Sequence, residues 1–178
     1  RTMLYNIHEH QWDEELLDLF DIPKAILPEV KASSEVVCTT SGKIFSAKIH
    51  IACIAGDQQA ALFGQLCTQK GIVKTTYGTG CFLMLNTGDK PLKSNNRLLT
   101  TVAYRLNGKP TYAIEGSIFM AGATVQWLRD KLGIIRQASD TEALAAGIDY
   151  RQTELLIPAF TGLGAPHWQP QVKAALLG

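Results

Sequence analysis

The sequence predicts an α/β fold whose sheet is partly antiparallel. Four short runs rich in β-branched and aromatic residues follow one another between residues 72 and 115, and glycine-containing turns join them, as in an antiparallel sheet. Patterns with helical spacing precede and follow these runs, at residues 57–66 and 120–132. Strands and helices therefore share one chain of 178 residues, whose 46% hydrophobic and 19% charged residues are ordinary for a globular core.

The first third of the chain is predicted to contain a helix, a strand and a second helix. Residues 12–20 carry apolar side chains at helical spacing, and Asp13 to Glu15 bring negative charge to the first turn, which favours a helix start. Residues 49–54 form a short apolar run that predicts a buried strand. Gly56 ends this strand, and a helix is expected to begin at Asp57.

The rest of the chain is predicted to form a four-stranded sheet, then two helices and a last strand. Asn107-Gly108 is a strong signal for a type I′ hairpin turn. Gly133 is the expected end of the first helix, while Ser139 and Glu142 are expected to form a capping box at the start of the second. The strands are expected at residues 72–77, 81–86, 98–106, 111–115 and 155–157.

A domain boundary is predicted near residues 65–71, where the helical pattern gives way to strands, so that the domains would be residues 1–65 and 66–178. The formal net charge of +1, with no cluster of Lys and Arg, predicts no nucleic-acid partner. No apolar run approaches the ~18 residues that a membrane span needs, and no secretory leader follows Arg1, so we expect no membrane partner.

The cysteines and histidines form no recognisable metal-binding or catalytic motif. The cysteines are too far apart in sequence for a C-x-x-C metal site, and they are expected to be small, buried, unpaired residues of a reducing compartment. The sequence therefore predicts a cytoplasmic protein without a metal ligand set of this kind. The cysteines are Cys38, Cys53, Cys67 and Cys81.

Asp57 supports two interpretations. As a helix N-cap, its carboxylate would accept hydrogen bonds from the first-turn N–H groups. As a catalytic base, it would orient and deprotonate an attacking hydroxyl, and the positive end of the helix dipole would keep it ionised. Phosphoryl transfer tolerates a weak base because its transition state is loose and positioning supplies most of the rate. The two roles are compatible.

The turn Gly78-Thr79-Gly80 joins two apolar runs and also supports two interpretations. The simpler is a hairpin in which the glycines adopt positive φ. The functional one is a phosphate cradle, in which backbone N–H groups and the Thr79 hydroxyl bind phosphate oxygens. It is not a Walker A loop, since the Gly-Lys-Ser/Thr portion is missing.

Ala121-Gly122-Ala123 puts small residues inside a predicted helix. Gly costs up to ~1 kcal/mol relative to Ala in a helix, so it usually marks a close approach of another group. That group is either the neighbouring sheet or a nucleotide lying against the helix.

Several motifs in order resemble the glycerol kinases, which belong to the sugar-kinase family with the actin/hexokinase-like fold. The most specific are DQQAALFGQ at residues 57–65 and TYGTGCF at residues 76–82. Further matches are RTML at 1–4, LPEV at 27–30, SSEV at 33–36, FMAGA at 119–123, QWLRD at 126–130 and PAFTGLGAP at 158–166.

The resemblance implies part of an actin/hexokinase-like (ribonuclease H-like) fold: the end of a first, substrate-binding domain and the start of a second, nucleotide-binding one. It implies ATP-dependent phosphorylation of glycerol to glycerol 3-phosphate with Mg²⁺, by a homo-oligomer in the full-length enzyme. Asp57 would be the catalytic base and a glycerol ligand, Gln58 would bind a glycerol hydroxyl, and Phe82 would lie against the glycerol carbons. The nucleotide would be bound by Gly78, Thr79, Gly122 and Gln126.

The chain also departs from the family. Other phosphate, magnesium and glycerol ligands of the family lie upstream of Arg1 and its adenine-binding glycines beyond Gly178, so the segment is expected to be inactive alone. Residues 39–48 lack the glycine-rich, Arg-bearing stretch that binds a sugar bisphosphate in some bacterial members, and HWQP at 167–170 replaces the usual YWDP. Two alternatives stay open: a kinase for another polyol or sugar, and a non-catalytic ATP-binding or scaffold protein on an actin-like fold.

Overall fold

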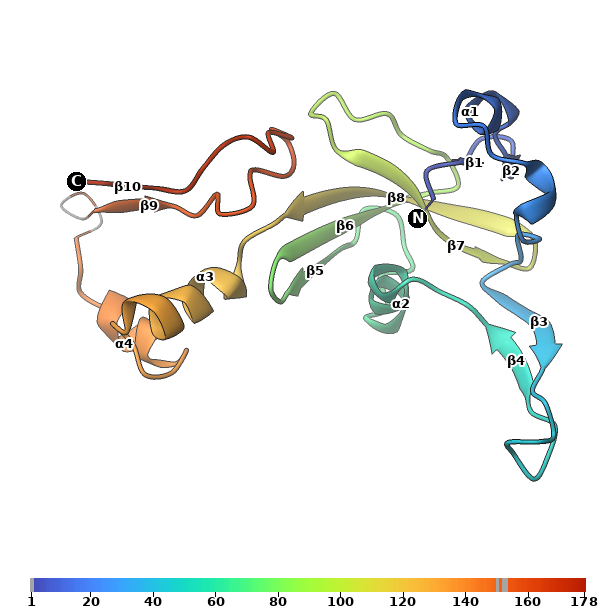
Figure 1. The fold of residues 1–178 in the computed structure, drawn as a ribbon, viewed down its shortest axis with the longest axis horizontal. Helices are drawn as coiled ribbons and strands as arrows, with labels where there is room; N and C mark the ends of the chain where they lie inside the picture. Colours follow the sequence, from blue (N-terminus) through green and yellow to red (C-terminus); the bar gives the residue numbers. More distant parts are fainter. Residues whose placement is uncertain (1, 150, 152–153) are drawn as a thin grey trace. The chain divides into compact units, whose positions relative to one another are not determined.

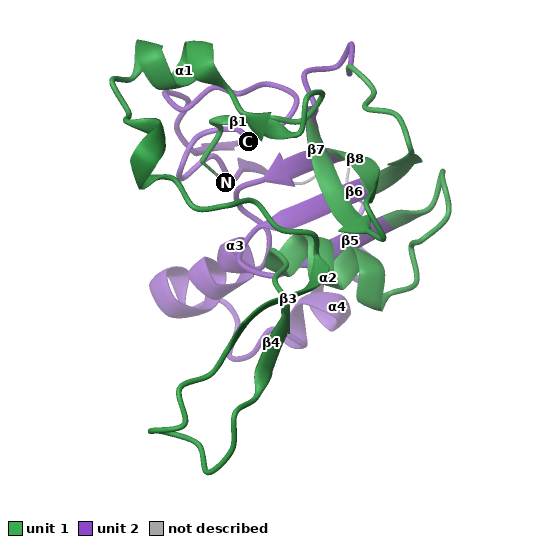
Figure 2. Ribbon diagram, turned by 90° about the vertical axis from the view of Figure 1, so that its right-hand side faces the viewer, with its two compact units in different colours: residues 1–73, 85–93, 100–114 green, residues 74–84, 94–99, 115–178 purple. Residues whose placement is uncertain are grey.

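The fold is known from a computed structural model that describes residues 2–149, 151 and 154–178 (Figure 1). Arg1, the first residue of the RTML motif, lies outside the described residues. The chain divides into two compact units, coloured green and purple in Figure 2. Unit 1 contains residues 1–73, 85–93 and 100–114, and unit 2 contains residues 74–84, 94–99 and 115–178.

Unit 1 begins with a small two-stranded sheet and a short helix. Asp13 is the N-cap of this helix, since its Oδ1 accepts a hydrogen bond of 3.1 Å from the Leu16 N–H, and the predicted helix is confirmed. Leu17 is its buried residue. The elements in order are β1 (Tyr5–Asn6), β2 (Gln11–Trp12), α1 (Glu14–Leu19), the 3₁₀ turn η1 (Lys24–Ile26), β3 (Ser34–Thr39), β4 (His50–Cys53) and α2 (Asp57–Gly64).

Strands β3 and β4 form an antiparallel hairpin that leads into α2 (Figure 1). Thr39 pairs with His50, and the register is irregular between Ser34 and Cys38. Every residue of β4 is exposed, so the predicted strand exists but its predicted burial is wrong. The reason is that neither face of the hairpin is covered within the described chain. For the same reason Cys38 and Cys53 are exposed, contrary to expectation, while Cys67 and Cys81 are buried as expected.

The four predicted strands of the main sheet are confirmed, with ends that differ by a few residues. The strand order is β5-β6-β8-β7. Asn107 and Gly108 have φ values of 49° and 76°, as a type I′ turn requires. The strands are β5 (Val73–Tyr77), β6 (Cys81–Gly88), β7 (Leu99–Leu106) and β8 (Lys109–Ile118).

After the four-stranded sheet, unit 2 continues with helices and a two-stranded sheet. Gly133 has a φ of 64° and ends the first helical stretch, as predicted. The capping box is wrong, because Ser139 makes no side-chain cap bond. The neighbouring Asp140 carboxylate instead accepts the backbone N–H groups of Arg136 and Gln137, at 2.9 and 3.1 Å. The elements are α3 (Gly122–Trp127), the π-helical η2 (Leu128–Leu132), α4 (Asp140–Ala145), β9 (Leu155–Ile157) and β10 (Ala175–Leu177), with β9 and β10 antiparallel.

Both units bury polar side chains beside their apolar cores. In unit 1, Asn86 is buried, donates to the Cys67 carbonyl at 2.9 Å and accepts the Gly88 N–H at 2.8 Å. In unit 2, the buried Lys74 ammonium donates to the Thr76 hydroxyl at 2.7 Å. Among the described residues, no helix combines the length and the apolar character that crossing a membrane requires.

Candidate functional site

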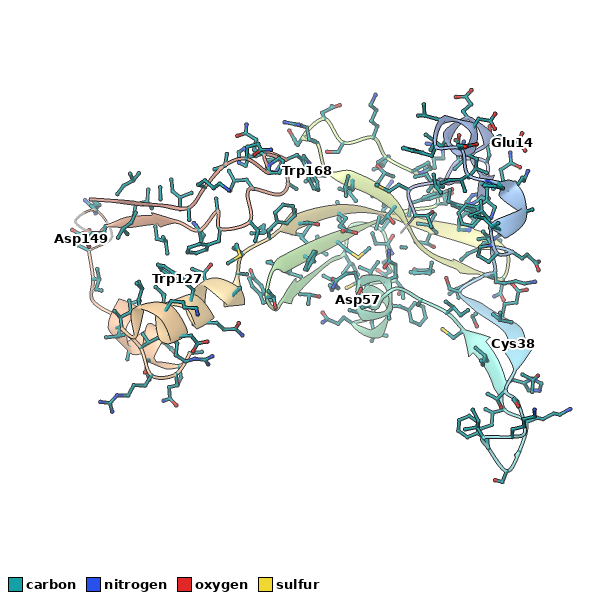
Figure 3. All side chains as sticks on the ribbon, in the orientation of Figure 1. Glu14, Cys38, Asp57, Trp127, Asp149 and Trp168 are labelled. Atoms are coloured by element: carbon teal, nitrogen blue, oxygen red, sulfur yellow. The ribbon has the colours of Figure 1, made fainter. Side chains whose placement is uncertain are left out.

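Asp57 is the first residue of α2, where Figure 3 labels it. Gly56, in an extended conformation, is the N-cap, and no side chain caps this helix. The N-cap interpretation of Asp57 is therefore wrong: the carboxylate lies one position too far into the helix. It is exposed instead, and its Oδ2 accepts a hydrogen bond of 3.2 Å from Nε2 of Gln58. An exposed carboxylate at a helix N-terminus stays available to a ligand and lies where the helix dipole favours negative charge.

A cavity of about 480 Å³ in unit 1 includes Asp57 in its lining. The start of α2 forms one side, and residues 102–104 of β7 contribute another part of the lining. Tyr104 also contacts Phe63 of α2 edge-on, with ring centroids 5.4 Å apart. Strand β7 and helix α2 thus pack against each other beside Asp57, which lines the cavity between them.

The turn Gly78-Thr79-Gly80 is tighter than expected. The Gly78 N–H donates to the Gly80 carbonyl at 2.8 Å, but neither glycine has a positive φ, so the predicted reason for the glycines is wrong. A Cβ on Gly80 would lie 2.6 Å from the Ile118 carbonyl oxygen, whereas one on Gly78 would meet nothing nearer than 3.9 Å. Gly80 is therefore needed for the close approach of β8. Thr79 is exposed, and its hydroxyl has no hydrogen-bond partner within the described chain.

Helix α3 packs directly on this turn. The Gly122 N–H donates to the Gly78 carbonyl at 2.8 Å, and the N–H groups of Ala121 and Ala123 donate to the Thr79 carbonyl at 2.9 and 3.1 Å. A Cβ on Gly122 would lie 2.6 Å from the Gly78 oxygen. The small residues of the helix are thus explained by contact with the turn, which fixes the turn's carbonyls toward α3.

The four residues that the resemblance assigned to the nucleotide line one cavity of unit 2. Its volume is about 520 Å³, and Gly78, Thr79, Gly122 and Gln126 all contribute to its wall. Phe82 lies on β6 in the same unit and is half-buried, whereas Asp57 and Gln58 belong to unit 1.

Sequence reasoning missed five lining residues of this cavity. Arg129 is exposed and pairs side-on with Asp130: its Nε and Nη2 donate to the two carboxylate oxygens at 2.6 and 3.0 Å. This hydrogen bonding lowers the pKa of Asp130 and raises the pKa of Arg129, so both stay charged. A helical stripe counted from Gly122 in steps of three and four residues would have found Arg129. The missed residues are Tyr77, Val125, Arg129, Ala138 and Thr141.

The resemblance to the glycerol kinases implies Mg²⁺, and the described side chains form no multi-ligand cluster for it. No three His, Cys, Asp or Glu side chains come together as metal ligands anywhere in residues 2–149, 151 and 154–178. Magnesium is usually held by carboxylates together with substrate phosphates. The described residues therefore supply no cluster of three such ligands for this ion.

Two family models match almost the whole chain. The model of the C-terminal domain of the FGGY family of carbohydrate kinases matches residues 73–178, and that of the N-terminal domain matches residues 1–64. The chain belongs to the FGGY family of carbohydrate kinases. Its fold is therefore actin/hexokinase-like in part, as the resemblance implied.

Individual FGGY kinases are similar to this chain over its full length. A glycerol kinase of Burkholderia pseudomallei (strain K96243) is 60% identical over all 178 residues, which are 36% of that relative. The crystal structure of Plasmodium falciparum glycerol kinase with ADP matches with a TM-score of 0.86 and 37% identity, over 100% of this chain and 36% of that one. Xylulose kinase from Rhodospirillum rubrum, at 18% identity and a TM-score of 0.75 over 98% of this chain and 36% of that one, shares the fold. The chain thus spans about a third of the length of these FGGY relatives.

Proposed function

We propose that this chain is the central segment of an enzyme that transfers the γ-phosphoryl group of ATP to glycerol. One observation carries the proposal: the four residues that the family resemblance assigns to the nucleotide line a single cavity of unit 2. The choice of glycerol is supported by the 60% identity with the Burkholderia pseudomallei glycerol kinase, which extends over the whole segment.

Asp57 is the proposed base. Its carboxylate is exposed, carries no capping bond and is steadied by the Gln58 amide at 3.2 Å. It would accept the proton of the attacking glycerol hydroxyl as that oxygen bonds to the γ-phosphorus, while the bond from the γ-phosphorus to the β–γ bridging oxygen breaks and ADP leaves. Gln58 would hold a second hydroxyl, and Phe82 would pack against the carbon chain. Because the transition state of phosphoryl transfer is loose, positioning by these groups contributes more than the basicity of Asp57.

The turn and α3 are the proposed nucleotide site. The Thr79 hydroxyl has no partner in the described chain, so it is available to a phosphate oxygen without breaking an existing bond. Gly122 and Gln126 would continue the site along the helix. Mg²⁺ would reach this site with the phosphates of ATP, since the described residues form no ligand cluster of their own.

Several further properties belong to the same proposal. Residues 1–65 and 66–178 would be parts of the two kinase domains, which the matches at residues 1–64 and 73–178 support. The complete enzyme would be a cytoplasmic homo-oligomer. The segment alone would not catalyse the reaction, because groups that the family places outside it are needed to position ATP and glycerol.

A segment exchange tests the proposal. The 178 residues would replace the matching residues of the Burkholderia pseudomallei glycerol kinase, and ADP release would be measured with and without glycerol. Glycerol-dependent turnover near that of the parent is expected, and Asp57→Asn in the same hybrid is the control for a background kinase. D-Xylulose and erythritol, offered in parallel, separate a glycerol kinase from a kinase for other polyols or sugars. A folded hybrid without turnover on any substrate would favour a non-catalytic ATP-binding role.

A further inference from the structure

Arg129 lies in the wall of the unit-2 cavity, one helical turn beyond Gln126. Gly122, Val125, Gln126 and Arg129 recur in steps of three and four residues, so they share one face, and all four line the cavity. Among the described residues of this lining, Arg129 alone carries a charge. Its surroundings in the cavity are otherwise a hydroxyl-bearing turn, an amide and apolar groups.

The charge matters because a nucleotide is a polyanion. The turn at Gly78 and Thr79 offers neutral donors, which bind phosphate oxygens without compensating their charge. A guanidinium is always protonated in proteins and matches phosphate with two parallel hydrogen bonds. Among the described residues of the lining, Arg129 is therefore the one cationic donor, and the Asp130 carboxylate beside it offsets part of its charge.

The contact with Asp130 orients the Arg129 guanidinium and leaves some of its N–H donors available. Nε and Nη2 each donate one hydrogen bond to the carboxylate. Nη1 has no hydrogen-bond partner within the described chain, so Nη1 and the second N–H of Nη2 form an edge with donors to spare. Because one edge is fixed, less rotational freedom is lost when the other binds an anion.

The position of Arg129 along the helix indicates which phosphate of the nucleotide it can reach. Gly122 touches the turn, and Arg129 follows seven residues later, about 10 Å along the axis. Side chains of a helix lean toward its N-terminus, which here is the end at the turn. If the terminal phosphates lie at Thr79, the next phosphate along the wall is the one within reach of Arg129. We propose that Arg129 binds the α-phosphate of an adenine nucleotide through its Nη1–Nη2 edge; this rests on the proposed function, in which the cavity holds that nucleotide.

The test is a calorimetric titration of the segment-exchange hybrid with ADP, AMP and adenosine. Arg129→Gln is compared with Arg136→Gln, which removes the same charge from an exposed residue of the same unit that does not line the cavity. Arg129→Gln should raise the Kd of ADP and of AMP about tenfold, since a hydrogen bond to a charged group is lost. It should leave the weaker binding of adenosine unchanged, and Arg136→Gln should change none of the three.

Other results would overturn the assignment. If Arg129→Gln binds ADP as the unaltered hybrid does, Arg129 has no role, while nucleotide binding in the cavity stands. If adenosine loses as much affinity as AMP, the contact is with the nucleoside. Equal losses in both variants would reveal a general effect of charge. If the unaltered hybrid turns over but Arg129→Gln leaves all three affinities as they are, this inference alone fails; if the unaltered hybrid binds no ADP, the proposed function fails with it. Should Arg129→Gln not fold, Arg129→Lys is the second variant, because it keeps the positive charge but cannot donate two parallel hydrogen bonds. It should still weaken the binding of ADP more than the binding of adenosine.

Discussion

Replacing Gly122 by Ala should destabilise the chain, although the same change stabilises most helices. The added Cβ would lie 2.6 Å from the Gly78 carbonyl oxygen, about 0.9 Å inside a contact of ~3.5 Å. Moving α3 away by that amount would stretch the 2.8 Å bond from the Gly122 N–H to Gly78 beyond the useful range of ~3.2 Å. The helix cannot keep both this bond and the methyl group.

The magnitude follows from two opposing effects. Overpacking costs about 1–3 kcal/mol, and the higher helix propensity of Ala returns at most ~1 kcal/mol. A net loss of about 1–2 kcal/mol in the free energy of unfolding is therefore expected. Because the displaced helix α3 carries Gln126 and continues into η2, which carries Arg129, ADP binding should weaken in the same variant.

Gly64→Ala is the matched control. Gly64 ends α2, its φ is not positive, and a Cβ there would meet no atom within 4 Å. The free energy of unfolding of this variant should rise by about 0.4–1 kcal/mol. Urea unfolding of the three proteins, followed by far-UV circular dichroism, gives both changes. If Gly122→Ala proves as stabilising as Gly64→Ala, the close contact between α3 and the turn does not exist in solution.

Three further predictions concern the Gly78–Gly80 turn and Asp57. Gly80→Ala should lower the free energy of unfolding by about 1–3 kcal/mol, because its Cβ would lie 2.6 Å from the Ile118 carbonyl oxygen, whereas Gly78→Ala should leave it nearly unchanged. Thermal melts compare the two variants, and equal losses of stability would contradict the reasoning. Asp57→Asn in the segment-exchange hybrid should lower the melting temperature only slightly, since the exposed carboxylate caps nothing and loses only its interaction with the helix dipole. It should lower kcat about 10²–10⁴-fold in a coupled assay, and a near-normal kcat would exclude Asp57 as base. Thr79→Ala in that hybrid should raise the Kd of ATP by a factor corresponding to about 1.5–3 kcal/mol and leave glycerol binding intact in calorimetry; equal losses for both ligands would indicate a structural role.

Local patterns predicted the elements well where the chemistry is local. The type I′ turn at Asn107-Gly108 and the end of the helix at Gly133 depend on backbone preferences of the residues themselves, and both are confirmed. The capping box at Ser139 failed because Ser139 has helical backbone angles, φ −63° and ψ −21°, whereas a capping residue is normally extended. A spacing rule between two residue types does not report the backbone angles that a cap requires.

Burial was harder to predict, because it depends on what covers an element and not on its own residues. The run at residues 49–54 is apolar and forms a strand, yet all of β4 is exposed. An apolar run indicates that a strand is suited to burial. Whether it is buried depends on other elements that pack against it. Cys38 and Cys53 follow the same logic, since both lie on this hairpin.

The candidate nucleotide site shows how a wrong local reason can accompany the right residues. Gly78, Thr79, Gly122 and Gln126 line one cavity as a set, but Gly78 and Gly80 of the turn were expected for positive φ. Neither has a positive φ, and Gly80 instead allows the close approach of β8. Gly122 was expected to mark a close approach, and the group that approaches it is the Gly78 carbonyl of the turn. Such contacts join residues about forty positions apart, which no periodicity within one element encodes. The turn is therefore held by the start of α3 and the end of β8, and its shape depends on packing as much as on its own sequence.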